Sequence, residues 1–338
     1  MKIVRLRSIV FAAASLASFA VASLAPVSAA TATKSGAQPV GAANGMKLSP
    51  LRTDITLQPG TSGKVAVTVT NLTKATAMLQ PIENDFIASG ENGAPALVLD
   101  SNSYAPSHSL KRFMVPLSNI TVPAGQEQTV SVTITVPKTA QAGGYFGALR
   151  FAPANLSGPA ASGASVGESV ASLILLTVPG PTVEQLTLTN FDIQQNGGTA
   201  TNFRTPNDLS LLLRFQNKGN LQESPFGQVN VQKGKKVLYS YNFNQQEPKA
   251  EILPDSARRW NVPLKGLGKF GKYTISGTFG YGTKGQTIEI SKTVWIVPTV
   301  IIASIVGGII VLAALIGGLY LFLRSYKRKI LRSSRRRY

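Results

Sequence analysis

The sequence has 338 residues, with 34 lysines and arginines against 15 acidic residues, one histidine and no cysteine. The lack of cysteine excludes a disulfide framework, and one histidine is too few for a His/Cys transition-metal site. The formal net charge of +19 would indicate nucleic-acid binding only if it were spread along the chain. It is concentrated at the two ends, so we expect no nucleic-acid partner.

Residues 1–30 have the pattern of a secretory signal peptide. Three basic residues open the chain, an apolar stretch from Ile9 to Leu24 follows, and small residues from Val27 to Ala30 suit cleavage. An uncleaved signal anchor is the alternative, and the small residues favour cleavage. The next segment, 31–45, is rich in Ala, Thr and Gly, which predicts a flexible leader.

Between Met46 and Val297, apolar and β-branched residues alternate with polar ones, and Pro, Gly or Asn interrupts the pattern repeatedly. This pattern is typical of β-sandwiches, because period-two alternation buries one side of each strand. Pro179-Gly180-Pro181 breaks strand pairing and divides the region. The sequence therefore predicts an all-β fold with two tandem immunoglobulin-like β-sandwiches, over 46–180 and 181–297, each of about seven strands. A single large β-domain is the alternative.

The expected strands of the first module are 53–57, 64–70, 77–87, 113–117, 128–136, 145–151 and 170–178. Those of the second are 183–193, 210–216, 227–232, 236–243, 259–262, 272–279 and 287–296. The modules echo each other: VTVTNLTKAT with LLLRFQNKGN, FMVPL with RWNVPL, and GGYFGALRF with KYTISGTFGYG. The shared order favours two copies of one kind of sandwich.

The run GGYFGALRF lacks the following helix that a phosphate-binding loop requires, so it is interpreted as a turn feeding a strand. The Ala-, Gly- and Ser-rich segment 152–169 follows it, and we expect a long hairpin loop there. Asn155, Ser157 and Ser162 of this loop are candidate contacts for a partner.

Arg259, Trp260 and Tyr273 of the second module are further candidates, in a basic and aromatic surface for an anionic or sugar polymer. The alternative is that Trp260 and Tyr273 anchor the core of the second module, because the aromatics alternate with polar residues as strand cores do.

No residue is predicted to be catalytic, to bind a cofactor or to ligate a metal. The sole histidine, His108, lies in a polar loop-like stretch without a G-x-S-x-G motif. Glu83 and Asp85 share one face of a predicted strand, and a carboxylate-based envelope enzyme stays open as an alternative for this reason.

The stretch from Thr299 to Leu323 contains no charged residue and no polar face. It predicts a transmembrane helix over 298–323. Its small-xxx-small pairs, such as Ala303 with Gly307, suggest a homodimer through the helix.

The tail 324–338 carries eight basic residues and no acidic one, which predicts a cytoplasmic end held against anionic lipid. Without these and the three at the start, 23 basic residues remain against 15 acidic ones. We therefore expect a single-pass cell-membrane protein with most of the chain outside the cytoplasm.

The Pro59-Gly60 turn, Asn71, Val136-Pro137 and the Gly143–Tyr145 run resemble bacterial surface proteins of the WxL-interacting type. The order of segments is also similar to that family. The resemblance implies two immunoglobulin-like domains, a C-terminal membrane anchor, and binding of peptidoglycan or of an envelope surface protein with WxL motifs. We therefore expect a binding or scaffolding protein of the cell envelope that is not an enzyme. A pilus-chaperone-like assembly factor is the other alternative, because Val-Pro followed by Gly-x-Tyr also occurs in such modules.

Overall fold

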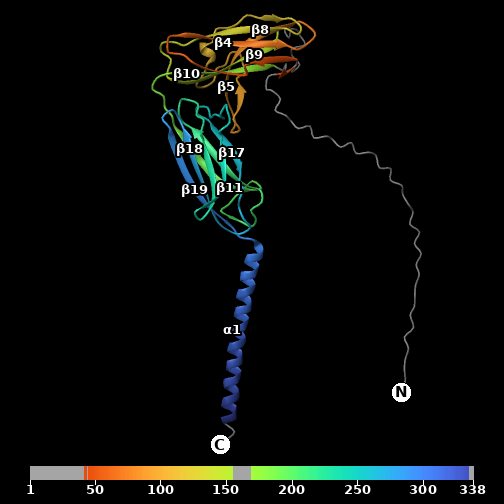
Figure 1. Cartoon of the computed structure of the whole chain (residues 1–338), viewed down its shortest axis with the longest axis vertical. Coiled ribbons are helices and arrows are strands. Elements are labelled where there is room, and N and C mark those ends of the chain that lie inside the picture. The colour runs from red at the N-terminus through yellow and green to blue at the C-terminus, as the bar shows by residue number, and fades with distance from the viewer. Residues whose placement is uncertain (1–41, 44, 155–168, 335–338) are drawn as a thin grey trace, which may run out of the picture. The chain divides into compact units, whose positions relative to one another are not determined.

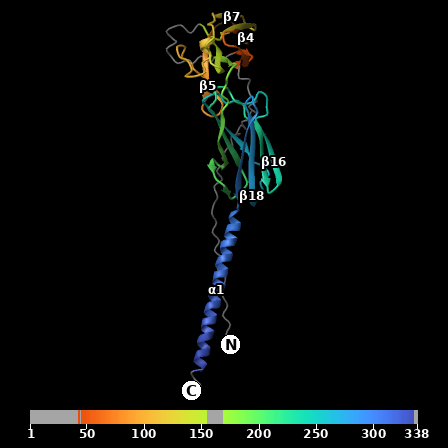
Figure 2. The same cartoon turned by 90° about the vertical axis from the view of Figure 1, so that its left-hand side faces the viewer.

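A computed structural model describes residues 42–43, 45–154 and 169–334. The predicted signal peptide, most of the predicted leader and Asn155, Ser157 and Ser162 lie outside these residues. The described chain contains two β-sandwiches in sequence, followed by helix α1 (Thr299–Ser334), as Figures 1 and 2 show. The predicted fold class, two tandem immunoglobulin-like sandwiches and one apolar helix, is confirmed.

The first sandwich packs a four-stranded sheet, β1-β2-β4-β8, on a second sheet in the order β3-β10-β9-β5-β6, with β7 also paired to β5. Its strands are β1 (Ala42–Ala43), β2 (Met46–Ser49), β3 (Arg52–Thr56), β4 (Ser62–Asn71), β5 (Ala77–Ser89), β6 (Ala94–Leu97), β7 (Ile120–Val122), β8 (Glu127–Thr135), β9 (Gly143–Pro153) and β10 (Val170–Val178).

The second sandwich has sheets β12-β11-β14-β17 and β13-β19-β18-β15-β16. Its strands are β11 (Leu186–Gln195), β12 (Gly198–Thr199), β13 (Asn202–Phe203), β14 (Leu209–Asn217), β15 (Phe226–Lys233), β16 (Lys236–Phe243), β17 (Ala257–Pro263), β18 (Gly271–Tyr281) and β19 (Gln286–Ile296).

The two sandwiches share one strand topology. In each, three central strands pair antiparallel, and a short strand near the start of the module pairs parallel with the last long strand: β3 with β10, and β13 with β19. In each of these pairs, both strands run toward the same end of the sandwich. The common topology agrees with the internal echo in the sequence.

Alternation places the core where the sequence predicts it. Val65, Val67 and Val69 of β4 are almost fully buried, and Val65 pairs across the sheet with Val132 of β8. Between them the intervening residues Ala66 and Thr68 are not core residues. Burying each such apolar side chain contributes roughly 1.5–3 kcal/mol, so these strands hold the first core together.

Each sandwich also buries one asparagine at the end of an inner strand. Asn71 donates from Nδ2 to the carbonyls of Ala75 (2.8 Å) and Val122 (3.0 Å). In the second sandwich, Asn217 donates in the same way to Leu221 (2.7 Å) and Ile252 (3.0 Å). Both side chains are fully buried. Each amide therefore bonds to a carbonyl four residues later in its own turn and to a carbonyl of a distant segment.

The predicted strand 113–117 is wrong. Residues Lys111–Phe113 form a short 3-10 helix, and Met114 makes only an isolated bridge to Ile134. The physical reason lies on β5, where the Asp85 carboxylate accepts the Lys111 N–H (2.8 Å) and Glu83 accepts the Leu117 N–H (3.0 Å). The segment keeps one backbone bond to β8, from the Val115 N–H to the Thr133 carbonyl (2.9 Å). The two carboxylates hold the backbone on either side of it, so no ladder forms.

The stretch GGYFGALRF forms most of β9, an inner strand between β10 and β5. Gly143 has φ +146, which L-residues with a side chain rarely adopt. Leu149 and Phe151 are fully buried in the first core. The predicted strand is confirmed, but it begins earlier than expected. Gly143 and Gly144 belong to β9 and pair with Val178 and Thr177 of β10 instead of forming a turn.

We expect Asn217→Ala to lower the free energy of unfolding by about 2–4 kcal/mol, because two buried carbonyls lose their donor. Chemical denaturation of the full chain in detergent measures this change. Asn242→Ala is the matched control, since Asn242 lies exposed on β16. Equal stabilities of the two variants would contradict the role given to the buried amide.

Candidate functional site

Asn220 joins the two sandwiches. Its Nδ2 donates to the Ala142 carbonyl (2.8 Å), and its own carbonyl accepts the Gly144 N–H (2.8 Å). The same side chain accepts the Val183 N–H through Oδ1 (2.8 Å). A Cβ on Gly143 would lie 2.6 Å from the Asn220 carbonyl oxygen. Glycine is therefore required at the start of β9 because the second sandwich approaches it so closely.

The hairpin between β5 and β6 makes a second connection. Glu91 at its tip accepts from Arg214 Nε (2.9 Å) and Nη2 (2.8 Å), and it pairs with Arg259 (2.9 Å). Its backbone carbonyl also accepts the Arg259 N–H of β17 (2.7 Å). The Arg214 guanidinium beside Glu91 lowers the pKa of that carboxyl. One carboxylate on sandwich 1 thus holds two arginines on sandwich 2.

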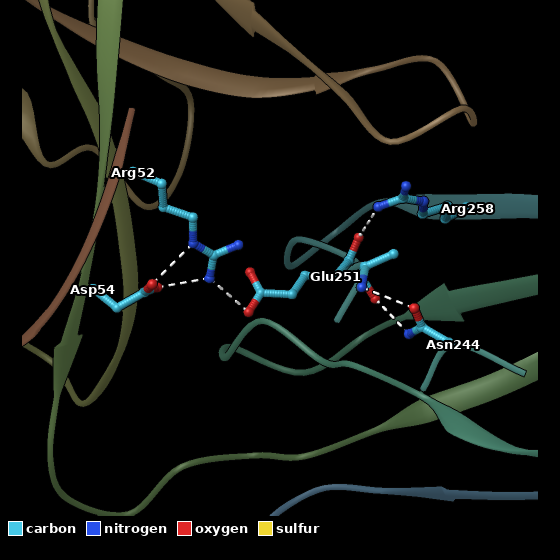
Figure 3. A network of polar contacts seen from close by, with 6 residues as sticks. Arg52, Asp54, Asn244, Glu251 and Arg258 are labelled. Atoms are coloured by element: carbon cyan, nitrogen blue, oxygen red, sulfur yellow. Dashed lines mark hydrogen bonds and ion pairs between the residues drawn. The ribbon is translucent and has the colours of Figure 1, made fainter. Parts of the chain in front are cut away.

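A third connection runs from β3 of the first sandwich to the segment before β17 of the second, as Figure 3 shows. Arg52 of β3 donates from Nη2 to Asp54 (2.7 Å) and to Glu251 (2.8 Å). Burial raises the pKa of Glu251, and the neighbouring Arg52 partly offsets that shift. The Asp54 hydrogen bond raises the pKa of Arg52, so this guanidinium stays charged.

The backbone that carries Glu251 is fixed from within sandwich 2 (Figure 3). Asn244 donates to the Ala250 carbonyl and accepts the Ala250 N–H, both at 2.8 Å. Arg258 donates from Nη1 to the Glu251 carbonyl (2.9 Å). Two side chains, Asn244 and Arg258, therefore set the position of one loop that faces sandwich 1.

Between these connections lies a cleft of about 150 Å³. A cavity of this volume accommodates one benzene-sized group. Its apolar part continues a small cluster on the outer face of the first sandwich, in which Phe86, Phe146 and Leu175 are buried and Leu253 of the second sandwich packs against them. The residues that line it include Phe86, Ala88, Gly93, Ala94, Pro95, Leu173, Leu175, Leu253, Ser256 and Ala257, together with Arg52, Lys249, Glu251 and Arg258.

Arg258 is one of four charged residues that line the cleft. Burial lowers the pKa of its guanidinium, and its Nε is buried without a hydrogen-bond acceptor. Its guanidinium carbon lies 5.0 Å from the Trp260 ring centroid, and a Cβ on Gly93 would overlap the guanidinium. The side chain is therefore held between an aromatic ring and a glycine, and it places a buried positive charge beside the cleft.

The predicted contact residues are placed differently from one another. Arg259 is half exposed and pairs with Glu91. Trp260 packs edge-on against Phe215 and Phe243, while Tyr273 is buried in the second core. Trp260 and Tyr273 therefore occupy core positions, and whether the three residues bind a partner stays a prediction.

Sequence reasoning placed Arg258 in the basic and aromatic surface of the second module, but it missed the other charged residues at the cleft and its edges. Arg52, Glu91 and Glu251 are single charges on separate segments, and no periodicity links them. The one available signal was Gly93 after Glu91-Asn92, which marks a tight hairpin tip. That signal predicts a turn but not what the turn touches.

Glu83, Asp85 and His108 form hydrogen bonds to the backbone within sandwich 1. Asp85 also accepts the Ala105 N–H (2.9 Å), and His108 Nδ1 hydrogen-bonds the Gly144 carbonyl (2.6 Å). Within the described ranges, no group of three or more His, Asp or Glu side chains is placed to hold a metal ion. Asp85 and Glu83 thus have backbone partners that position the segment 99–117.

No protein-family model matches this sequence, and no curated protein matches it. Among solved structures, the chain is similar to the class 5 fimbriae chaperone CfaA, with 14% identity, a TM-score of 0.37, and coverage of 75% of this chain and 99% of that one. It is also similar to the CsuC–CsuE chaperone-tip adhesion subunit complex of Acinetobacter baumannii, with 12% identity, a TM-score of 0.33, and coverage of 64% and 89%. The Salmonella enterica SafA pilin–SafB chaperone complex matches with 13% identity, a TM-score of 0.32, and coverage of 73% and 95%.

We expect Glu91→Ala to weaken the contact between the sandwiches by about 1–2 kcal/mol, between the values for exposed and buried ion pairs. Two arginines then lose their partner. Calorimetry should show one unfolding transition for the wild type and a broadened or split transition for the variant. Glu127→Ala, an exposed change on β8, is the control, and identical broadening there would contradict this role of Glu91.

Proposed function

We propose that this chain is a membrane-anchored binding protein of the bacterial cell envelope, and that the cleft between its two sandwiches holds a segment of a protein partner. The single observation that carries the proposal is the cleft itself. It combines largely apolar lining residues, a volume of about 150 Å³ and the guanidinium of Arg258. Such a site suits one apolar side chain beside a carbonyl or carboxylate oxygen.

Protein is favoured over peptidoglycan as the partner for two reasons. Sugar polymers are commonly held on exposed aromatic rings, whereas Trp260 and Tyr273 pack against or within the second core. The lining of the cleft is largely aliphatic, and its volume of about 150 Å³ suits one apolar side chain of a peptide. A surface protein with WxL motifs, the partner implied by the family resemblance, would supply side chains of this kind.

A pilus-chaperone-like assembly factor is the second candidate, and one observation favours it. Val170, Ala171 and Ser172 at the start of β10 pair with β9, but β3 pairs only from Leu173 onward. Ser172 is fully buried, and its hydroxyl donates to the Pro50 carbonyl (2.7 Å). The unpaired edge, to which a client strand could add, is therefore confined to Val170 and Ala171.

Helix α1 supports the membrane anchor. Its stretch Thr299–Arg328 is long and apolar enough to cross a membrane, and none of the window that meets this test is buried. Tail residues such as Arg324, Lys327 and Arg328 favour a cytoplasmic C-terminus by the positive-inside rule. With this topology, both sandwiches would lie outside the cytoplasm.

Blocking the cleft tests the proposed function. Ala94 lines the cleft and is exposed, so Ala94→Trp should fill it without a buried clash. We expect the full chain in detergent to retain envelope proteins in a pull-down, and Ala94→Trp to reduce that retention at least fivefold. Ala124→Trp, an exposed change in the turn before β8, is the control and should retain them fully.

The same assay includes purified peptidoglycan as a separate bait. Retention by peptidoglycan that Ala94→Trp leaves unchanged would contradict a protein-binding cleft and favour a wall-binding surface elsewhere. Retention of unfolded pilin-like clients would instead support the chaperone-like candidate, provided that substitutions at the start of β10, at Val170 and Ala171, abolish it.

The anchor is tested by charge. We expect the double change Ile309→Lys and Leu312→Lys to move most of the chain from the membrane to the soluble fraction, because each lysine at the helix centre costs about 2.5–3.5 kcal/mol. Fractionation and immunoblotting measure it. Leu72→Lys adds a charge to an exposed residue of sandwich 1 and should leave the protein in the membrane. Retention of the double variant would contradict a spanning helix.

A further inference from the structure

A second pocket lies in sandwich 2, at the turn between β18 and β19. It has a volume of about 260 Å³ and is lined by Glu184, Leu221, Gln222, Glu223, Ser224, Phe226, Lys249, Gly282 and Thr283. Two acidic side chains line it, one from the segment after Pro181 and one from the segment before β15. The proposed function assigns no role to this pocket.

Oxygen atoms converge on this turn around Gly282. Glu223 accepts the Gly282 N–H through Oε2 (3.1 Å). Glu184 accepts the Thr283 N–H (3.0 Å) and the Thr283 hydroxyl (2.6 Å). A Cβ on Gly282 would lie 2.7 Å from Glu184 Oε2 and 2.8 Å from Gln286 Oε1. Glycine is therefore required here, because Glu184 and Gln286 approach its Cα too closely for any other side chain, while Glu223 holds its N–H.

Two of these oxygens have no donor. Glu223 is only 3% exposed, yet its Oε1 has no hydrogen-bond partner, and neither has the buried Oε1 of Gln286. Leaving a buried acceptor unpaired costs about 1–3 kcal/mol, and more for a charged group. A carboxylate so deeply buried calls for a positive charge or a proton.

The neighbouring cations do not supply that charge. Lys249 also lines the pocket, but its ammonium pairs with Glu247 and lies 5.6 Å from the Phe226 ring centroid. Lys284 acts on Glu184, whose pKa is lowered mainly by the Thr283 hydroxyl and only in part by this lysine. Burial and the nearby Glu184 raise the pKa of Glu223 to about 7.

We propose that Glu184, Glu223 and Gln286 form a Ca²⁺ site at this turn. Calcium prefers carboxylate and carbonyl oxygens, tolerates irregular geometry and completes its shell with water. Magnesium demands a near-ideal octahedron and dehydrates reluctantly, which two carboxylates and one amide on three separate segments do not provide. With only two carboxylates, the site belongs to the weak class of extracellular modules, with a Kd of about 10⁻⁴–10⁻³ M.

Calcium here would connect three segments of sandwich 2. Glu184 lies just after the Pro179–Pro181 break, Glu223 lies between β14 and β15, and Gln286 begins β19. A shared ion fixes the entry of the chain into the second sandwich against the β18–β19 turn. The ion would therefore stabilise the segment that leads from the first sandwich.

Terbium luminescence and thermal unfolding test the site in the full chain, held in a neutral detergent after EDTA treatment. Tyr281 precedes Gly282 and can sensitise bound Tb³⁺. We expect Tb³⁺ emission that millimolar Ca²⁺ displaces, and a rise in Tm of several degrees with 5 mM Ca²⁺ but little with 5 mM Mg²⁺. Glu223→Gln and Glu184→Gln should each reduce the emission at least fivefold and abolish the Ca²⁺-dependent rise.

Two controls accompany these variants. Glu289→Gln removes an exposed charge from β19 and should bind like the wild type. Tyr281→Phe should lose the emission and keep the rise in Tm. Displaceable emission equal to wild type in Glu223→Gln would overturn the site.

The pH dependence of stability distinguishes a Glu223 that binds Ca²⁺ from a Glu223 that takes up a proton. In EDTA, the raised pKa of Glu223 means that the unfolded chain ionises this group first, near pH 4.5, and the folded chain only near pH 7. Wild-type stability relative to Glu223→Gln should therefore fall as the pH rises through that window. Calcium should restore it at pH 8. If this difference persists at pH 8 in saturating Ca²⁺, Glu223 is a buried acid that takes a proton, and the proposal is wrong.

Discussion

The hydrogen bonds of Asn220 set the relation between the two sandwiches. One residue binds the start of β9 and the segment after Pro181 at once, through both its side chain and its carbonyl. The Glu91 and Arg52 ion pairs reach across the same contact, and each needs its partner within about 3 Å. The bonds of Asn220 are short and reach backbone on both sandwiches, so they hold the sandwiches at a separation that the ion pairs can span.

The connections differ in strength because they differ in exposure. Exposed pairs generally contribute less than 1 kcal/mol, whereas buried hydrogen bonds to backbone are costly to break. Asn220 supplies neutral bonds to backbone, and the ion pairs add direction to them. Polar contacts therefore lie at the edges of the cleft, while its lining is largely apolar. A ligand in the cleft, as proposed, could therefore bind and leave while the contacts of Asn220, Glu91 and Arg52 between the sandwiches persist.

Sequence periodicity predicted the inner strands well and the cleft not at all. The Val65–Val69 and Val130–Ile134 alternations have one interpretation, because a shift by one residue would expose every valine. The segment 113–117 looked like a strand for its Phe-Met-Val run, but carboxylates on β5 hold its backbone. Such contacts join residues that are far apart in sequence, so a local pattern cannot contain them. The same limit applies to Glu223, whose burial depends on the β18–β19 turn.

The last long strand leads almost directly into the anchor, since β19 ends at Ile296 and α1 begins at Thr299. A pull between membrane and ligand would therefore enter the second sandwich at the end of β19. That end is secured by β18 on one side and, through Trp295 and Ile296, by the parallel β13 on the other. Force along a strand loads its ladder bonds in shear, so many must break together. The position of this strand suits the molecule to carry mechanical tension.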